Sequence, residues 1–462
     1  MNQPENKSTK FFIILVTTLA SFMTAFMGSA INVALPIIGK EFKADAILLS
    51  WLSTSYLVTT AVLLIPVGKL SDIYGRARFF KAGIVIFAVF SLLTGFSGSA
   101  PMLLIFRAFQ GVGSSMIFST STAILVSAFD PNERGKVIGI NIASVYTGLS
   151  SGPFLGGLIT HYLNWRYIFY STSVIGAASL ILMLIKIKDE WKEEVKEKFD
   201  IMGSLIFVFT LTILMVGFTF LPAIYGFILL ITGAIGLFIF LRLEDKRPYP
   251  MLNINIFRSS RTYTFSNIAA LINYSATFAL TFLLSLYLQN VKMLSPQDTG
   301  IILVTQPVMM ALFSPFAGRI SDKIEPRRVA SIGMMLLTIG LIVFIFLTPD
   351  TEYFLIVINL AVLGLGFALF SSPNTNAIMS AVERKYYGIA SSTLALMRLI
   401  GQMFSMGIVI VIFSILIGKV EISPENRESF LHSMKIAFIL FSILSFGGIF
   451  ASLARGKIHK EL

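Results

Sequence analysis

The chain contains no cysteine and only three histidines, His161, His432 and His459, among its 462 residues. Without cysteine it can form no disulfide, thiolate metal site or cysteine nucleophile, and three scattered histidines do not make a ligand cluster. Charged residues are also scarce, at 13% of the chain. So few charges cannot cover the surface of soluble domains of this length. Since ligand residues are also missing, we expect neither a metal site nor a cofactor.

Apolar residues, by contrast, make up 55% of the chain, and its mean hydropathy is +0.82. A helix of about 20 apolar residues crosses the roughly 30 Å of hydrocarbon in a bilayer. The first apolar run continues well beyond a signal-peptide core, so we count it as a retained helix. The sequence therefore predicts an all-α polytopic membrane protein with fourteen crossings, near residues 11–39, 47–68, 79–98, 101–126, 136–160, 166–185, 201–221, 223–241, 263–288, 298–318, 329–347, 353–374, 386–417 and 434–454.

Lysine and arginine are spread unevenly over the loops that these crossings define. An even number of crossings places both termini on one side, and that side holds 27 of the 36 basic residues, against seven on the other side and two within the membrane. Cytoplasmic loops carry such an excess. Both termini are therefore predicted to be cytoplasmic in a plasma-membrane protein, and the formal charge of +12 indicates no nucleic-acid partner.

Two stretches of the sequence resemble each other. Gly68-Lys-Leu-Ser-Asp-Ile-Tyr-Gly-Arg76 follows the second predicted helix, and Gly318-Arg-Ile-Ser-Asp-Lys-Ile-Glu-Pro-Arg327 follows the tenth. Such a repeat indicates a duplicated unit. Because the offset is eight helices, more than a six-helix unit needs, helices seven and eight are predicted to be inserted. The predicted segments are an N-terminal six-helix bundle (1–185), a charged cytoplasmic linker (186–200), two additional helices (201–243), a second cytoplasmic linker (244–262), a C-terminal six-helix bundle (263–454) and a cytoplasmic tail (455–462).

The first linker, residues 186–200, mixes acidic and basic residues around a single tryptophan. Charge runs of this kind are typical of a solvated segment that is partly helical through Glu–Lys pairs. A specific binding role is the alternative interpretation.

Four motifs carry a resemblance to a known family. Gly68-x-Leu-Ser-Asp72-x-x-Gly75-Arg76 looks like the cytoplasmic signature of the major facilitator superfamily, and Arg107-Ala-Phe-Gln110-Gly111-Val-Gly113 resembles its second signature. The run from Gly148 to Gly157 is similar to the pattern of antiporters, and Asn32-Val-Ala-Leu-Pro36 with Trp51-Leu-Ser-Thr-Ser-Tyr56 resembles the fourteen-helix drug:proton antiporter branch. The resemblance implies a major facilitator fold, with two six-helix bundles plus two inserted helices, and multidrug efflux by alternating access.

The repeated turn is the first group of expected functional residues. Asp72 is suited to bridge a neighbouring helix end with Arg76 as its partner, which would lock the inner side in one state and release it in the other. Ordinary anchoring by basic residues is the alternative. The predicted inner-gate residues are Gly68, Asp72, Gly75, Arg76, Gly318 and Asp322.

A glycine stripe on the fifth predicted helix forms the second group. Small residues four apart allow two helices to approach closely, and a proline allows a bend. Plain packing is the alternative, whereas the resemblance implies that this face lies between the two halves and closes the inward-open cavity. The predicted hinge residues are Gly148, Gly152, Pro153, Gly156 and Gly157.

Two arginines are predicted to lie at membrane depth, Arg107 on the fourth helix and Arg398 on the thirteenth. A cation there must face protein or water, which makes each a functional-site candidate. Asn32 and Tyr56 fall at a depth similar to that of Arg107, so these three are predicted to line one cavity. The resemblance implies a coupling role for Arg107, with Gln110 one turn deeper. For Arg398, bonding to carbonyls at a helix break is the alternative.

No predicted helix core contains Asp, Glu or His. Drug:proton antiporters commonly carry an acid in the middle of helix one, where this chain has Met27. Since carboxylates usually hold cationic drugs, the interior favours anionic, zwitterionic or neutral amphiphiles. No phosphate-binding Gly-rich motif is present in the sequence, so ATP-driven transport by this chain is excluded and a gradient must drive it, with protons expected and sodium open.

Together these features predict a transporter rather than an enzyme, and a monomer that has membrane lipid as a partner. It is expected to export small amphiphilic molecules, drug-like or lipid-like, by proton antiport. An exporter of anionic or lipid-linked substrates with atypical or no proton coupling is the second interpretation. A non-transporting sensor or a membrane enzyme is the third.

Overall fold

Every regular element in the described part of the chain is helical. The structure is a computed structural model, and it describes residues 7–187, 190–191, 199–247, 254–383, 386–418, 420, 422 and 426–456. Within these ranges fourteen helical spans are long and apolar enough to cross a membrane. The predicted all-α fold with fourteen crossings is confirmed.

The spans fall into three groups along the chain. The first six are α1 (Lys7–Phe42), α2 (Ala46–Tyr74), α3 (Arg76–Gly95), α4 (Ala100–Ala128), α5 (Pro131–Tyr162) and α6 (Arg166–Lys186). The inserted pair is α7 (Ile201–Phe220) and α8 (Ile224–Glu244), followed by the short α9 (Ile254–Ser259). The last six spans begin with two that are each built from several elements. The first of these joins α10 (Arg261–Thr277), α11 (Ala279–Leu286) and the π-helical η1 (Tyr287–Val291), and the second joins α12 (Pro296–Leu303) and α13 (Thr305–Lys323). The other four are α14 (Pro326–Phe344), α15 (Tyr353–Ser380), α16 (Tyr387–Leu416) and α17 (Arg427–Leu453).

Local sequence signals fix several helix starts. The Asp45 carboxylate accepts a hydrogen bond from the Leu48 backbone N–H at 2.7 Å at the start of α2. Ser295 caps α12 in the same way, by accepting from the Asp298 N–H at 3.1 Å. Such caps satisfy N–H groups that have no partner within the helix. The first residue of α5 and of α14 is a proline, which has no N–H to satisfy.

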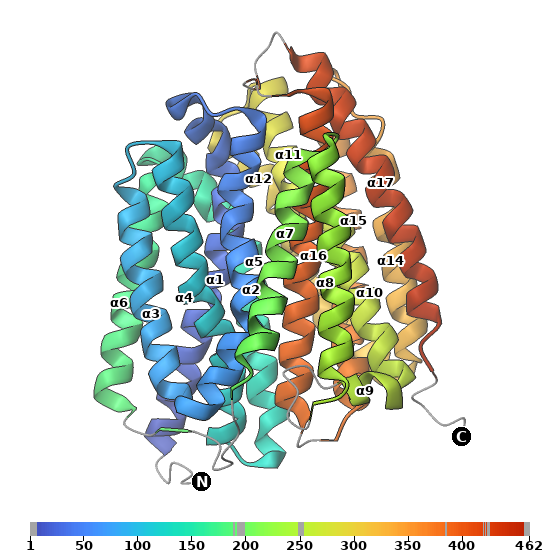
Figure 1. Cartoon of the computed structure of the whole chain (residues 1–462). Coiled ribbons are helices and arrows are strands. Elements are labelled where there is room, and N and C mark those ends of the chain that lie inside the picture. Colours follow the sequence, from blue (N-terminus) through green and yellow to red (C-terminus); the bar gives the residue numbers. More distant parts are fainter. Residues whose placement is uncertain are drawn as a thin grey trace.

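The helices form two bundles with a helical pair between them (Figure 1). Spans α1 to α6 pack as one bundle, and α10 to α17 pack as the other. The green helix α7 lies along the seam where α2 meets α16, and α8 packs on α7 (Figure 1). There the Trp51 indole N–H donates to the Thr219 hydroxyl at 3.0 Å, and the rings of Phe218 and Phe404 lie 6.0 Å apart.

Helix α1 begins and α17 ends at the same end of the molecule (Figure 1). We name this the inner end, after its excess of lysine and arginine. At the outer end the bundles touch directly: the Gln289 side-chain amide donates to the Val33 carbonyl at 2.8 Å, and the Ala46 N–H donates to the Val420 carbonyl at 3.1 Å. The halves are thus joined on the outer side.

Candidate functional site

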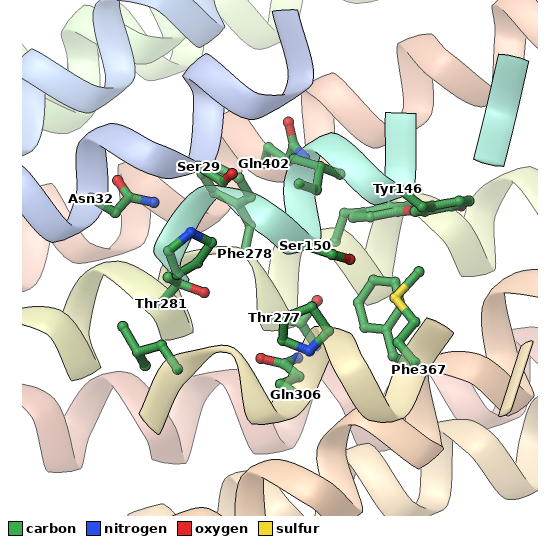
Figure 2. Close-up of a pocket in the computed structure, with 16 residues that line it drawn as sticks. Ser29, Asn32, Tyr146, Ser150, Thr277, Phe278, Thr281, Gln306, Phe367 and Gln402 are labelled. Atoms are coloured by element: carbon green, nitrogen blue, oxygen red, sulfur yellow. The ribbon is translucent and has the colours of Figure 1, made fainter. Parts of the chain in front are cut away.

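A central pocket of about 100 Å³ lies between the two bundles. Helices α1 and α5 supply one wall, and the spans α10 to α13, α15 and α16 supply the other. None of the sixteen residues that line it is charged, and Figure 2 shows hydroxyl and amide groups together with aromatic rings around this space. The polar and aromatic members are Ser29, Asn32, Tyr146, Ser150, Tyr274, Thr277, Phe278, Thr281, Gln306, Phe367 and Gln402.

A chain of hydroxyl groups crosses between the bundles at this pocket. Tyr146 of α5 and Tyr274 of α10 have their hydroxyl oxygens 3.0 Å apart, and the Ser371 hydroxyl of α15 donates to the Tyr146 oxygen at 2.6 Å. These bonds join three helices from both halves. A movement of one bundle against the other must therefore break or exchange them.

A second cavity, of about 590 Å³, extends from the central pocket toward the inner end. Its walls are α5 on one side and α13 with α15 on the other. It shares Tyr146, Ser150, Pro307 and Met310 with the central pocket. The two spaces therefore form one path from the middle of the molecule toward the inner end.

Arg107 lies inside the first bundle, in a fully buried polar network. One guanidinium N–H donates to the Gln110 side-chain oxygen at 2.7 Å, and Nε donates to the Leu52 carbonyl at 3.3 Å. Gln110 in turn donates to the Ser91 hydroxyl at 2.6 Å. Atom Nη2 of Arg107 has no hydrogen-bond partner. The cation is thus held by neutral acceptors rather than by a carboxylate.

The ring of Tyr56 covers this cation, with the guanidinium carbon 4.4 Å from the ring centroid. The Tyr56 hydroxyl is fixed by the Thr24 carbonyl at 2.8 Å and the Ser114 hydroxyl at 2.7 Å. The structure therefore brings Tyr56 and Arg107 together, but neither is among the residues that line the two cavities, whereas the sequence predicted that they line one cavity with Asn32. Asn32 does line the central pocket, and its side-chain oxygen accepts from Ser53 at 3.0 Å.

Arg398 lies near the seam between the bundles, on α16. Its guanidinium carbon is 5.5 Å from the centroid of the Phe118 ring on α4 of the other bundle. A cation over an aromatic face is attracted by the ring quadrupole. Arg398 is mostly buried and is not among the residues that line the two cavities.

The first predicted gate turn is well defined at the inner end. The Asp72 carboxylate accepts from Arg76 Nε at 2.6 Å, and Arg76 Nη1 donates to the Ser127 hydroxyl of α4 at 2.5 Å. Gly75 has a φ of 122°, a backbone conformation that suits glycine. The turn thus packs on its own bundle.

The second copy keeps part of this arrangement. The Ser71 hydroxyl donates to the Gly68 carbonyl at 2.7 Å, and the Ser321 hydroxyl donates to the Gly318 carbonyl at 2.7 Å. The repeat seen in the sequence is therefore also a repeat in structure. Asp322 lies on α13, but its side chain is outside the described part of the chain.

The predicted hinge residues divide between two neighbours. A Cβ added at Gly148, Gly152 or Gly156 would collide with α1, and at Gly156 it would come within 2.8 Å of the Ala30 carbonyl oxygen. Those three glycines pack within one bundle. Gly157 faces α12 of the other bundle, where a Cβ would lie 2.5 Å from the Pro296 carbonyl oxygen, and Pro153 lines the central pocket.

Sequence reasoning did not single out the pocket residues Tyr146, Tyr274, Gln306 and Gln402. The two glutamines carried a usable signal, because an amide in an apolar membrane helix needs a polar partner or a cavity. The tyrosines gave no comparable signal, since the crossing of helices from two bundles brings their hydroxyl groups together.

Comparisons with known proteins place the chain in a family. A family model described as "Major Facilitator Superfamily" matches residues 17–257 and 267–460. The chain is 32% identical over 392 residues to "Riboflavin transporter RibZ" of Clostridioides difficile, with 84% of this chain and 85% of that protein covered. It is 30% identical over 403 residues to "Multidrug resistance protein Stp" of Mycobacterium tuberculosis, with 85% and 74% covered.

A solved structure supports the fold. The inward-facing, unoccupied structure of a bacterial homologue of the human lysosomal transporter Spinster matches with a TM-score of 0.69 at 15% identity, covering 97% of this chain and 98% of that chain. The fourteen spans also fit the drug:proton antiporter branch that the motifs indicated. The protein is therefore a multi-pass membrane transporter that belongs to the Major Facilitator Superfamily.

Proposed function

We propose that this protein is a secondary active exporter of small amphiphilic molecules, which works by alternating access across the plasma membrane and is driven by proton antiport. The observation that carries the proposal is the central pocket between the bundles, with its uncharged, partly aromatic wall. Aromatic rings bind the apolar part of an amphiphile, and the hydroxyl and amide groups bind its polar edge.

The charge of the substrate follows from the same wall. A cation that leaves water for this pocket would find no carboxylate among the residues that line it. Desolvation of an unpaired charge is costly, so a neutral molecule is favoured over a cation. An anionic or lipid-linked substrate remains the second candidate, because Arg398 lies between the two bundles and Arg107 inside the first bundle.

Riboflavin is a specific candidate for the neutral class. The name of the relative from Clostridioides difficile suggests it, and the pocket offers amide groups at Asn32, Gln306 and Gln402 beside Phe278 and Phe367. A planar ring with an imide edge can stack on such rings and pair with such amides. The test substrates should therefore include riboflavin beside drug-like dyes.

The proposal is tested with purified protein in liposomes under an imposed pH gradient. We expect movement of neutral dyes or riboflavin that stops when the gradient is collapsed. In Thr281→Val, which removes a pocket hydroxyl without changing side-chain shape, we expect several-fold weaker apparent affinity. Thr232→Val makes the same change on the exposed face of α8 and should behave like the wild type. Gradient-independent leakage, or no movement of any probe, would contradict the proposal.

A further inference from the structure

Two residues of the first linker dock on the inner gate. The Trp191 carbonyl accepts a hydrogen bond from the Arg76 backbone N–H at 2.7 Å, and the Glu190 carboxylate accepts from the Ala77 N–H at 2.8 Å. The other Glu190 oxygen lies 3.6 Å from Arg78 Nε. The linker therefore contacts the first three residues of α3, immediately after the gate turn.

Helix α3 needs such a partner because its own cap provides none. The cap residue Gly75 has no side chain and forms no side-chain hydrogen bond to the helix. The first N–H groups of a helix lack partners within it, and its N-terminus favours a negative charge. Glu190 supplies both an acceptor and that charge, so it performs the role that Ser or Asp performs at other helix starts.

Glycine at position 75 also makes room for the docked carboxylate. A Cβ at Gly75 would lie 2.7 Å from Glu190 Oε1, and the φ of 122° disfavours any other residue. The glycine in the gate motif thus serves two purposes, the turn itself and the approach of the linker.

The burial of Trp191 shows that the contact between the linker and α3 is more than a charge pair on a solvated segment. Its side chain is only 3% exposed and belongs to the hydrophobic core of the described chain. Burying a tryptophan removes some 150–250 Å² from water, which stabilises the docked position. The sequence predicted a solvated linker, whereas the described residues at its centre are packed against the gate.

The consequence concerns Arg76, whose side chain is bound to Asp72 and Ser127 while its backbone N–H is bound to Trp191. We propose that Glu190 and Trp191 are positioning residues of the inner gate, which hold the α2–α3 turn in the conformation seen here, with the inner cavity open. This gating role rests on the proposed transport function, but docking and gate position can be measured without a substrate.

Docking is tested by tryptophan fluorescence. Trp51 and Trp165 are replaced by Phe, so that Trp191 is the single emitter, and iodide is added as a quencher. We expect weak quenching with Glu190 present and at least twofold stronger quenching in Glu190→Ala. Glu190→Asp, which keeps the charge, should restore most of the protection. Equal quenching with and without the carboxylate would overturn the docking.

Gate position is tested in the otherwise wild-type chain, whose lack of cysteine makes a single introduced thiol specific. Ala143 lines the inner cavity and is exposed, so Ala143→Cys reports its opening through the rate of maleimide labelling. We expect Glu190→Ala to slow labelling at least twofold and Glu190→Asp to restore it. Glu197→Ala, which removes the same charge from the same linker, is the matched control and should leave the rate unchanged.

An unchanged labelling rate in Glu190→Ala, or an equal fall in Glu197→Ala, would overturn the gating role. Neither readout needs a transported molecule, so both stand if none of the probes proves to be a substrate. If the wild type does transport, Glu190→Ala should reduce the rate several-fold, with recovery in Glu190→Asp. Normal transport by Glu190→Ala would count against the linker alone and leave the transport function in place.

Discussion

The two copies of the gate turn begin their second helix in different ways. In the first copy Gly75 leaves the start of α3 without a cap of its own, and Glu190 and Trp191 supply the partners from the linker. In the second copy α14 begins with Pro326, directly after Glu325. Proline has no N–H and its fixed φ suits the first helical turn, so this start needs one partner fewer.

The two copies therefore share the Ser–Gly hydrogen bond of the turn, whereas the helix that follows begins with different partners in each. A turn that a distant segment completes can change its position when that segment leaves. Proline fixes φ at the start of α14, so we expect the second turn to change its position less. We therefore expect the first bundle, which also holds the buried Arg107 network, to be the more sensitive half in transport.

The largest effect is expected at the two arginines, one in each half. Arg107→Ala leaves the buried Gln110 side-chain oxygen without its donor, and a buried acceptor left unpaired costs about 1–3 kcal/mol. We expect it to abolish transport, and Arg107→Lys to retain a minor fraction because the planar fork is lost. Arg398→Ala should be milder. Transport rates in liposomes, normalised to folded protein, decide this; full activity of Arg107→Lys would contradict it.

The next effect compares the repeated aspartates. Asp72→Asn removes the charge that pairs with Arg76 at 2.6 Å. Charge-assisted bonds are roughly twice as strong as neutral ones, so we expect transport to fall about tenfold, against less than about twofold for Asp322→Asn. Both proteins should elute as folded monomers in size-exclusion chromatography. Equal losses in the two variants would remove the proposed asymmetry between the halves.

A smaller effect separates packing within a bundle from packing between bundles. Gly157→Leu would push α5 away from α12, so export should fall several-fold while the melting temperature changes little. Gly152→Leu collides with α1 of the same bundle and should lower the melting temperature by several degrees. A thermal melt beside the transport assay distinguishes them. The assignment fails when Gly157→Leu exports normally.

The smallest effect concerns substrate charge. Because no carboxylate lines the central pocket whereas the Arg398 cation lies near the seam between the bundles, monovalent cationic dyes should move several-fold more slowly than neutral or anionic dyes of similar size. Initial rates for matched dye sets measure this. Permanently charged cations that prove the best substrates, and that compete with protons, would require a carboxylate from a helix end to reach the cavity.

Much of the architecture was predictable because it depends on local pattern. Apolar runs of membrane-spanning length gave the fourteen crossings, and the Gly-x-x-Ser-Asp repeat gave the relation between the two halves. In the site, the motif that contains Asn32 led to a residue that does line the central pocket. These features need only the spacing of residues along one helix.

The remainder depends on contacts between segments far apart in the chain. Nothing in the spacing of Tyr56 and Arg107 shows that the tyrosine ring covers the cation, or that neither residue lines the two cavities. Gly148 and Gly157 belong to one glycine-rich run, yet they face different bundles. Trp191 stands in a run of charged residues, and the composition of that run predicted a solvated linker. Its burial depends on the contact with α3, which the spacing of residues does not show.

The placement of α7 gives the protein two unlike faces within the lipid. Along one seam between the bundles, the Phe218 ring of α7 lies against the Phe404 ring of α16. The Ser414 hydroxyl of α16 donates to the Leu221 carbonyl at 3.0 Å, so α7 covers this seam. Along the opposite seam, α5 faces α13 across the inner cavity, and Val308 in its wall is 46% exposed. Under the proposed function, a solute dissolved in the leaflet at the inner end would reach the inner cavity through the seam between α5 and α13, because α7 covers the other seam. The rotational orientation of the transporter among neighbouring membrane proteins would then set which lipid-borne molecules it collects.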